Sequence, residues 1–349
     1  MNYQFRKQGA RLCLFLVLLL TGCDSTQQPA HQNQFSYSDW IMGTTFNIKI
    51  PKLPKGVDDE QLKVEIMSLL VEIDSQMSTY KQDSELSKIN ASTTTDKIVI
   101  SAALFKVLTE AQRISMLSAG AFDITVGPLV NLWGFGPDKT VTEPPSEQLI
   151  EQALEKIGND CFLLDQTTQS IEKLNSEIYL DLSALAKGYA VDQVAALLES
   201  KQVSDFLVEI GGELNLKGHN GDNQAWRIAV EKPDAESRTI QSVISATDIA
   251  IASSGDYRNF FEQDGQRYSH TIDPRTGWPI THKLVSVTVL SQSTMTADAL
   301  ATAFMVLGAE QGLALAEQEK MAVLFYLKSD NGFIEKSSTA YQNYLTEKK

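Results

Sequence analysis

A histidine beside a rigid turn is the residue of this sequence best suited to moving a proton. His270 lies in the segment 268–279, where an expected strand runs into a turn rich in aspartate, proline and glycine. Proline and glycine would fix this loop and hold the side chain at the mouth of a cleft. An imidazole titrates near neutrality, which suits removal of a proton from a hydroxyl nucleophile. Spacing alone favours the alternative, in which this histidine only caps or stabilises the turn.

An aspartate and a threonine four residues apart could share one metal ion. Asp298 and Thr302 would lie on one face of an expected helix, near its start. Mg²⁺ takes oxygen ligands in octahedral geometry and usually completes its shell with water and substrate phosphates. Two side chains and a backbone carbonyl would therefore suffice. The alternative assigns Asp298 to an interaction with the helix dipole and Thr302 to packing.

The segment 181–190 has the composition of a phosphate-binding turn. It runs from an expected strand into an expected helix and contains a carboxylate, free backbone amides and Lys187. Amides at a helix N-terminus favour phosphate, and the lysine would add positive charge, so the segment could receive a dinucleotide. A helix-capping Ser183 and a solvated lysine would explain the same residues. Tyr80 and the segment 121–123 could likewise be packing residues.

Several common catalytic signatures are missing from the sequence. There is no G-x-S-x-G elbow, H-E-x-x-H motif, Walker A loop or G-x-G-x-x-G fingerprint, which argues against ordinary hydrolases and Rossmann enzymes. The chain has four histidines, of which His31 lies in a polar N-terminal stretch and His219 in a loop rich in Gly, Asn and Asp. A histidine-rich metal site is therefore not expected.

Hydrophobic periodicity and capping signals indicate the elements that would position these residues. Asp58 and Ser101 each precede an amphipathic segment, as helix caps do. We expect helices at residues 58–77, 101–120, 146–157, 184–200, 296–307 and 310–318. We expect strands at residues 40–50, 122–126, 161–164, 170–174, 206–210, 226–230, 249–253, 284–290 and 322–327. Because helices and strands mix without regular alternation, repeat or long linker, we predict a single large α+β domain with mainly antiparallel sheet and flanking helices.

The N-terminus has the layout of an export signal. Three cations precede the apolar run 12–20, which is shorter than the about 20 residues needed to cross a bilayer as a helix. The residues at 20–23 resemble a lipobox, so we expect residues 1–22 to be a lipoprotein signal peptide and Cys23 to carry lipid. Asp24 resembles the signal that retains lipoproteins in the inner membrane. The prediction is a lipid-anchored protein on the periplasmic face, and the alternative is an uncleaved anchor helix.

The remainder of the chain divides into a tether and a folded domain. Residues 25–34 are polar and have too little apolar surface to offset ordering, so we expect the lipidated cysteine and a flexible tether at 23–36 and the folded domain at 37–345. The whole chain carries a formal net charge of -14, and the signal peptide holds three cations and no anions, so the mature part would carry -17. Such a surface repels nucleic acid, which we exclude as a partner. Cys161 has no second cysteine in this domain to pair with, and we expect it in the core.

Seven segments together resemble the motifs of one enzyme family. In chain order, they are residues 42–45, 78–80, 120–125, 181–190, 210–212, 270–274 and 298–302. They resemble the ApbE family, which consists of FAD:protein FMN transferases, and the match runs from about residue 40 to near 340. The resemblance implies an ApbE-like domain with a T-fold-related core.

The resemblance also implies the roles of individual residues. Contacts with the substrate FAD would be made by Met42, Tyr80, Ala121, Phe122, Asp123, Asp181, Lys187 and Ile272. Mg²⁺ would be bound by Asp298, Thr302 and the backbone carbonyl of Ala184. His270 would accept the proton of the acceptor hydroxyl while AMP leaves.

The family's acceptors are threonine or serine residues of membrane redox proteins, including the Rnf complex and the sodium-pumping NADH:quinone reductase. Export and lipid anchoring agree with such partners, because their acceptor domains face the same side of the membrane. Two other readings stay open. One is an FAD pyrophosphatase that releases FMN and AMP, and the other is a lipoprotein that binds flavin without catalysis.

Overall fold

The computed structural model describes residues 34–136, 143–231, 240–256, 260–263, 266–330 and 332–347. The predicted signal peptide, the lipidation site Cys23 and the predicted tether up to residue 33 lie outside the described residues. From residue 33 onward the chain forms one compact unit. The first strand begins at Phe35, so the last two residues that we assigned to the tether belong to the sheet.

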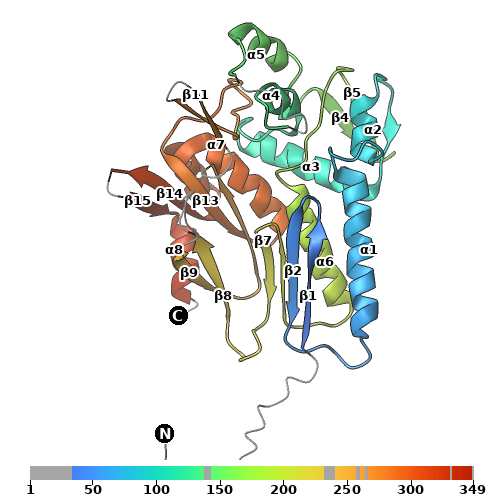
Figure 1. The fold of residues 1–349 in the computed structure, drawn as a ribbon, viewed down its shortest axis with the longest axis vertical. Coiled ribbons are helices and arrows are strands. Elements are labelled where there is room, and N and C mark those ends of the chain that lie inside the picture. The colour runs from blue at the N-terminus through green and yellow to red at the C-terminus, as the bar shows by residue number, and fades with distance from the viewer. Residues whose placement is uncertain are drawn as a thin grey trace, which may run out of the picture. The chain divides into compact units, whose positions relative to one another are not determined.

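An eight-stranded antiparallel sheet forms the centre of this unit (Figure 1). Every neighbouring pair of its strands is antiparallel. In order across the sheet the strands are β1 (Phe35–Ile41), β2 (Thr44–Ile50), β6 (Phe206–Ile210), β7 (Glu213–Lys217), β10 (Ile249–Gly255), β13 (Leu284–Ser291), β14 (Ala322–Ser329) and β15 (Gly332–Ser337). The predicted α+β class with mainly antiparallel sheet is confirmed.

Helices cover one face of the sheet and form the main hydrophobic core with it. They are α1 (Asp59–Met77), α3 (Ala102–Leu117), α6 (Ala186–Ser200) and α7 (Thr294–Gln318). The predicted caps are present, since Asp58 accepts a hydrogen bond from the Gln61 backbone N–H at 2.8 Å and Ser101 caps α3. Val323 and Phe325 of β14 pack into this core. The sheet and these helices therefore hold the starts of α6 and α7 at fixed positions.

The opposite face of the sheet is covered by a hairpin and the C-terminal helix. These elements are β8 (Trp226–Glu231), β9 (Ile240–Ala246) and α8 (Thr339–Glu347). Because side chains alternate along a strand, Leu324 and Tyr326 of β14 lie on this side, where they pack with Trp226 and Tyr341. The central strands of the sheet are thus buried on both faces, whereas the edge strands β1 and β15 are largely exposed.

Shorter elements make up the rest of the described structure. They are α2 (Glu85–Ala91), β3 (Ile98–Val99), η1 (Ile124–Val126), α4 (Gly127–Leu132), α5 (Glu147–Leu154), β4 (Phe162–Asp165), β5 (Ser170–Lys173), β11 (Phe260–Gln263) and β12 (Gln266–Ser269). Figure 1 places α4, α5 and β11 together at one end of the molecule. A separate small core that contains Leu129, Trp133, Ile150 and Ile272 joins them. This end of the fold carries the candidate site.

The strand predicted at residues 122–126 is wrong. The segment forms the 3-10 helix η1 and leads into α4. Asp123 causes the change, because its Oδ1 accepts hydrogen bonds from the Thr125 backbone N–H at 2.8 Å and from Thr125 Oγ1 at 2.7 Å. Pro128, in the first turn of α4, fits a helix start and cannot donate to a strand ladder.

The single strand predicted at residues 40–50 is a hairpin. Met42 (φ 52°) and Gly43 (φ 73°) form the two-residue turn between β1 and β2, and positive φ at both positions suits a hairpin turn. The strand expected just before α6 is also absent, since residues 179–182 are irregular. Cys161 is a free cysteine that packs partly buried against the main core, as expected.

The two helices predicted at 296–307 and 310–318 are one long helix with a kink. α7 runs from Thr294 to Gln318, and Gly308 (φ 75°) interrupts its helical backbone. Among the described residues, α7 is also the one helix long and apolar enough to cross a membrane. Much of it is buried, and it packs against α6, β10 and β13, so it is the core helix of this domain.

Candidate active site

One cavity of about 770 Å³ gathers most of the residues singled out from the sequence. The residues that line it include Tyr80, Ala121, Phe122, Asp123, Asp181, Ala184, Lys187, His270, Ile272, Asp298 and Thr302. They belong to loops, to α6 and to α7, which are far apart along the chain. The fold therefore brings the candidate base, the candidate metal ligands and the candidate dinucleotide contacts to one place.

A rigid loop holds His270 in this cavity. His270 follows β12 directly, and its ring lies 6.2 Å from the ring of Phe135. The turn after it is closed by hydrogen bonds, because Gly277 N–H donates to the Asp273 carbonyl at 2.8 Å. Buried Trp133 fastens the loop to α4, since its Nε1–H donates to the Gly277 carbonyl at 2.8 Å. The expected strand end and fixed turn are both confirmed.

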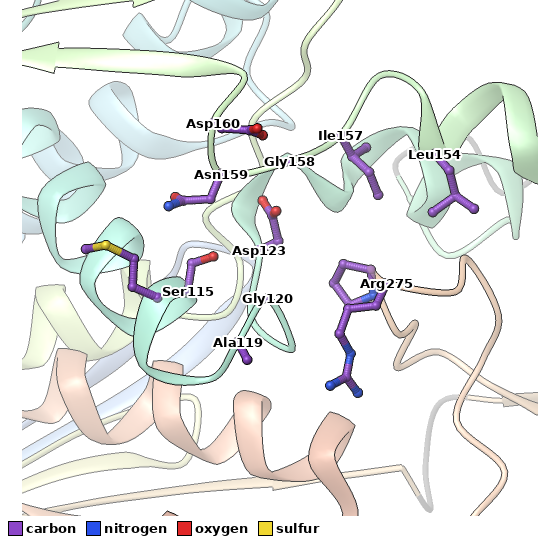
Figure 2. A pocket seen from close by; sticks show the side chains of 12 residues that line it. Ser115, Ala119, Gly120, Asp123, Leu154, Ile157, Gly158, Asn159, Asp160 and Arg275 are labelled. Carbon is purple, nitrogen blue, oxygen red and sulfur yellow. The ribbon is translucent and has the colours of Figure 1, made fainter.

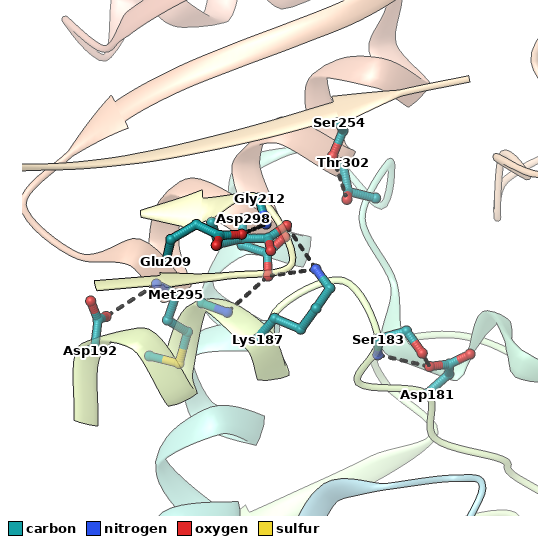
Figure 3. Close-up of polar contacts among 12 residues, drawn as sticks. Asp181, Ser183, Lys187, Asp192, Glu209, Gly212, Ser254, Met295, Asp298 and Thr302 are labelled. Carbon is teal, nitrogen blue, oxygen red and sulfur yellow. Dashed lines mark hydrogen bonds and ion pairs between the residues drawn. The ribbon is translucent and has the colours of Figure 1, made fainter. Parts of the chain in front are cut away.

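The candidate metal ligands lie on one face of α7. Asp298 is almost fully buried, and its Oδ2 accepts a hydrogen bond of 3.1 Å from the Gly188 backbone N–H. Thr302 Oγ1 lies 3.3 Å from Ser254 Oγ of β10. Figure 3 shows Asp298 and Thr302 on the same helix, with the start of α6 opposite Asp298. The donors here are oxygen atoms, which suit a hard cation such as Mg²⁺.

Lys187 is not a freely solvated lysine, since its side chain is 28% exposed and its ammonium is paired. Its Nζ lies 2.7 Å from Glu213 Oε1 and 3.8 Å from Asp298 Oδ2. Figure 3 shows Lys187 pointing toward Asp298. The side chains of both carboxylates are 5% exposed. Glu213 Oε2 is buried and accepts no hydrogen bond from the described residues. The lysine therefore sits between two buried acids at the wall of the cavity.

The electrostatics of this group favour an additional cation. Burial lowers the pKa of Lys187, but the charges of Asp298 and Glu213 outweigh burial and raise it above the ordinary value. Burial raises the pKa of Glu213 and of Asp298, although the charge of Lys187 opposes the rise. Two buried carboxylates share a single ammonium, and the pKa of Glu213 is raised to about 8, so ionising both acids in this cavity is costly. A bound cation would lower that cost.

The start of α6 differs from the simplest expectation. Leu185 is the N-cap of α6 and makes no capping hydrogen bond through its side chain, so Ser183 is not the helix cap. Asp181 Oδ1 instead accepts hydrogen bonds from the Ser183 backbone N–H at 2.8 Å and from Ser183 Oγ at 2.5 Å. The Asp181 N–H donates to the Ile124 carbonyl at 2.7 Å. This last bond joins the two loops that carry candidate FAD contacts.

Among the candidate residues that the structure describes, Met42 is the one that does not line the cavity. It lies at the tip of the β1–β2 hairpin and packs partly buried against the main core. The neighbouring Thr44 approaches the β6–β7 turn, because a Cβ built on Gly211 would lie 3.0 Å from Thr44 Cγ2 and 3.1 Å from Lys187 Cδ. The hairpin thus borders the stem of Lys187, and the contact of Met42 with FAD stays a prediction.

The cavity also has walls that our sequence reading missed. Aromatic side chains from the segment that follows α4 and from β11 line one part, namely Trp133, Phe135, Phe260 and Phe261. Glu213 and the end of β10 line another part. Two features of the sequence could have indicated these lining residues. Glu213 directly follows the glycine pair 211–212, and the aromatic residues 133 and 135 alternate with glycines.

A second, open groove of about 590 Å³ adjoins this cavity and shares Asp123 and Pro274 with it. Ser115, Asp160 and Arg275 also line the groove (Figure 2). Burial raises the pKa of Asp123, and the nearby charge of Asp160 adds to the rise, whereas hydrogen bonds from Thr125 oppose it. Asp123 therefore forms part of the wall between the two spaces.

No three His, Cys, Asp or Glu side chains within the described ranges lie close enough together to form a metal centre by themselves. A cation in this cavity would therefore need a backbone carbonyl, water or substrate oxygens besides Asp298 and Thr302. Mg²⁺ bound next to a substrate phosphate has such a ligand set.

Comparisons with known proteins agree with this geometry. The sequence matches the model of the ApbE family over residues 42–325. It is 46% identical over 336 residues to the FAD:protein FMN transferase of Vibrio cholerae, and the aligned region covers 96% of this chain and 98% of that protein. It is 44% identical over 321 residues to the FAD:protein FMN transferase of Haemophilus influenzae, and the aligned region covers 90% of this chain and 92% of that protein.

Solved structures have the same fold. The flavin transferase ApbE from Vibrio cholerae matches with a TM-score of 0.84 at 46% identity, covering 90% of this chain and 99% of that chain. The apo form of the flavinyl transferase ApbE from Pseudomonas stutzeri matches with a TM-score of 0.83 at 37% identity, covering 90% and 97%. The motif segments, the cavity that they line and these matches together lead to one conclusion. The chain belongs to the ApbE family.

Proposed function

We propose that this protein is a Mg²⁺-dependent FAD:protein FMN transferase. One observation carries the proposal: a single cavity contains an imidazole, a buried carboxylate–hydroxyl pair and the loops that carry the candidate dinucleotide contacts. The names of the relatives in Vibrio cholerae and Haemophilus influenzae support the same activity. The substrate would be FAD, and the acceptor would be a threonine or serine hydroxyl of another protein.

The residues present fit a divalent cation. Asp298 and Thr302 supply oxygen ligands from one face of α7, and the Ala184 carbonyl lies in the loop that precedes α6. A cation there would lower the cost of ionising the two buried carboxylates beside Lys187. When bound, Mg²⁺ would neutralise charge on the pyrophosphate of FAD.

The chain's own residues would perform the rest of the reaction. His270 accepts the proton of the acceptor hydroxyl as the hydroxyl oxygen forms a bond to the FMN phosphorus. The bond between that phosphorus and the bridging oxygen breaks, and AMP leaves. Lys187 places positive charge at the cavity wall, and the loops at 121–123 and 181–184 orient the dinucleotide. Positioning and electrostatics would supply most of the rate, as in other phosphoryl transfers.

The location and the partners of the enzyme belong to the same proposal. The N-terminal sequence supports a lipoprotein anchored through Cys23 in the inner membrane and facing the periplasm. Acceptors on that side of the membrane would include subunits of the Rnf complex and of the sodium-pumping NADH:quinone reductase. The excess of acidic residues argues against a nucleic-acid partner.

An assay that measures flavinylated acceptor, AMP and free FMN tests this function. The purified full chain is incubated with FAD, Mg²⁺ and a candidate acceptor domain, with a threonine-to-alanine variant of the acceptor as control. We expect a mass gain of one FMN group on the acceptor, release of AMP and no gain on the control. Free FMN with AMP and no gain on the acceptor would identify an FAD pyrophosphatase instead. Intact FAD would identify a flavin-binding protein without catalysis.

A further inference from the structure

We propose that Lys187 acts as an internal counter-ion that competes with the divalent cation for Asp298, and that Glu213 receives its ammonium group when the cation binds. The inference rests on the proposed metal site at Asp298 and Thr302. It adds a role for Glu213, which the motifs of the sequence do not assign.

The first step is the sharing of one ammonium by two carboxylates. Lys187 Nζ lies 2.7 Å from Glu213 Oε1, which is a charge-assisted hydrogen bond, and 3.8 Å from Asp298 Oδ2, which is an ion pair. Asp298 Oδ2 also accepts the hydrogen bond from Gly188 N–H. A cation on this carboxylate would meet the ammonium as a like charge at short range, so lysine and metal disfavour each other at Asp298.

The second step is that one carboxylate oxygen of Glu213 can accept a further hydrogen bond. Its Oε2 is buried and takes no hydrogen bond from any residue that the structure describes. A buried carboxylate oxygen without a donor is costly, and an ammonium that turns away from Asp298 can supply that donor. Glu213 can therefore hold the lysine through a second hydrogen bond while Asp298 binds the metal.

The third step is that the β6–β7 turn places Glu213 beside the stem of Lys187. Gly211 (φ 65°) borders the stem, because a Cβ there would lie 3.1 Å from Lys187 Cδ. Glu213 begins β7 two residues later, so the turn that meets the stem also carries the carboxylate. The side chain of Lys187 is 28% exposed, which leaves the ammonium room to shift between the two acids.

Direct metal binding by the full chain, without FAD, tests the inference. The probe is Mn²⁺, measured by electron paramagnetic resonance and displaced by Mg²⁺. Lys187→Met removes the competitor, and we expect it to tighten Mn²⁺ binding about tenfold, a change that general damage to the fold would not produce. Glu213→Gln leaves the lysine with Asp298 as its charged partner, and we expect it to weaken binding about tenfold. In the double variant the glutamine should have no further effect.

The matched control is Lys97→Met, which removes the lysine of an ion pair with Asp165 that does not line the cavity. We expect this control to leave Mn²⁺ binding unchanged. Unchanged or weaker binding in Lys187→Met would overturn the inference, and so would an equal effect of Glu213→Gln with and without Lys187. Asp298→Asn separates this failure from failure of the proposed function. If Asp298→Asn abolishes Mn²⁺ binding while the lysine variant changes nothing, the metal site stands and the counter-ion role falls.

Discussion

The backbone N–H of Gly188 donates a hydrogen bond of 3.1 Å to Asp298 Oδ2, across the contact between the starts of α6 and α7. The two helices meet here because position 188 has no side chain. A Cβ built on Gly188 would lie 2.5 Å from the Thr294 carbonyl oxygen and 2.7 Å from Met295 Cα. Both atoms belong to the backbone and cannot rotate away. The position of the buried carboxylate thus depends on this close approach.

Replacing Gly188 with alanine should separate the two helices. We expect Gly188→Ala to reduce the free energy of unfolding by about 1–3 kcal/mol, as overpacked cores do, and to raise the Mg²⁺ concentration required for activity. Urea unfolding and a Mg²⁺ titration of FMN transfer measure the two effects. Gly221→Ala is the control, because a Cβ there meets nothing within 4 Å. Equal stability of both variants would contradict the argument.

Removal of the imidazole should separate binding from transfer. His270→Ala should keep FAD binding within about threefold but lower the rate of acceptor flavinylation by about 10²–10⁴-fold, the usual contribution of a general base. Equilibrium titration of FAD and single-turnover mass spectrometry of the acceptor measure the two quantities. His219→Ala, an exposed histidine that does not line the cavity, should behave as the unmodified chain. Flavinylation at the original rate in His270→Ala would show that the base is another group.

Neutralising the buried aspartate should remove the metal requirement together with the activity. Asp298→Asn keeps the size of the side chain and an oxygen acceptor for Gly188 N–H, so the fold should survive. We expect transfer to fall by at least about 10²-fold and to respond no longer to added Mg²⁺. Activity measured with and without a chelator tests this result. Asp222→Asn, on the surface, serves as control. Retained activity with retained Mg²⁺ dependence would rule out Asp298 as the ligand.

The indole of Trp133 should be needed to hold the His270 loop. Trp133→Phe keeps most of the packing but leaves the Gly277 carbonyl without its 2.8 Å hydrogen bond. A buried acceptor without a donor costs about 1–3 kcal/mol, so we expect a loss of unfolding free energy in that range and slower transfer. Chemical unfolding and steady-state rates provide the measurements. Trp40→Phe replaces a tryptophan that is 62% exposed and should change neither the unfolding free energy nor the rate of transfer.

The pH dependence of transfer should report a nearby carboxylate. Burial raises the pKa of Asp256, whereas the charges of Arg267, His270 and His282 oppose this rise. The interaction is mutual, so the negative charge of Asp256 favours the imidazolium form of His270. Asp256→Asn removes that charge, so protonation of the His270 imidazole should require a lower pH. The acidic limb of the pH–rate profile should therefore move to lower pH, and a move to higher pH would contradict the proposed base.

The sequence determined the local elements and the residue types of the site. Asp58, Ser101 and the apolar periodicity predicted α1 and α3. The strands β6, β8, β10, β13 and β14 were predicted because their apolar runs are bounded by turn residues, whereas β7, β9, β11 and β15 were not predicted. Asp298 and Thr302 were placed on one helical face by their spacing alone. Such features depend on hydrogen bonds and burial within a few turns of chain, and a sequence pattern records them directly.

Only the tertiary structure decided how those residues meet. Hydrogen bonds between distant segments assemble the cavity, since Asp181 N–H donates to the Ile124 carbonyl at 2.7 Å and Trp133 Nε1–H donates to the Gly277 carbonyl at 2.8 Å. The contact of Lys187 with both Glu213 and Asp298 joins segments that are 26 and 111 residues away from it along the chain. The burial that raises the pKa of these acids comes from the packing of α6, α7 and β7 together. No local pattern encodes such a contact, because its energy arises from desolvation and charge pairing between elements that meet only in the folded chain.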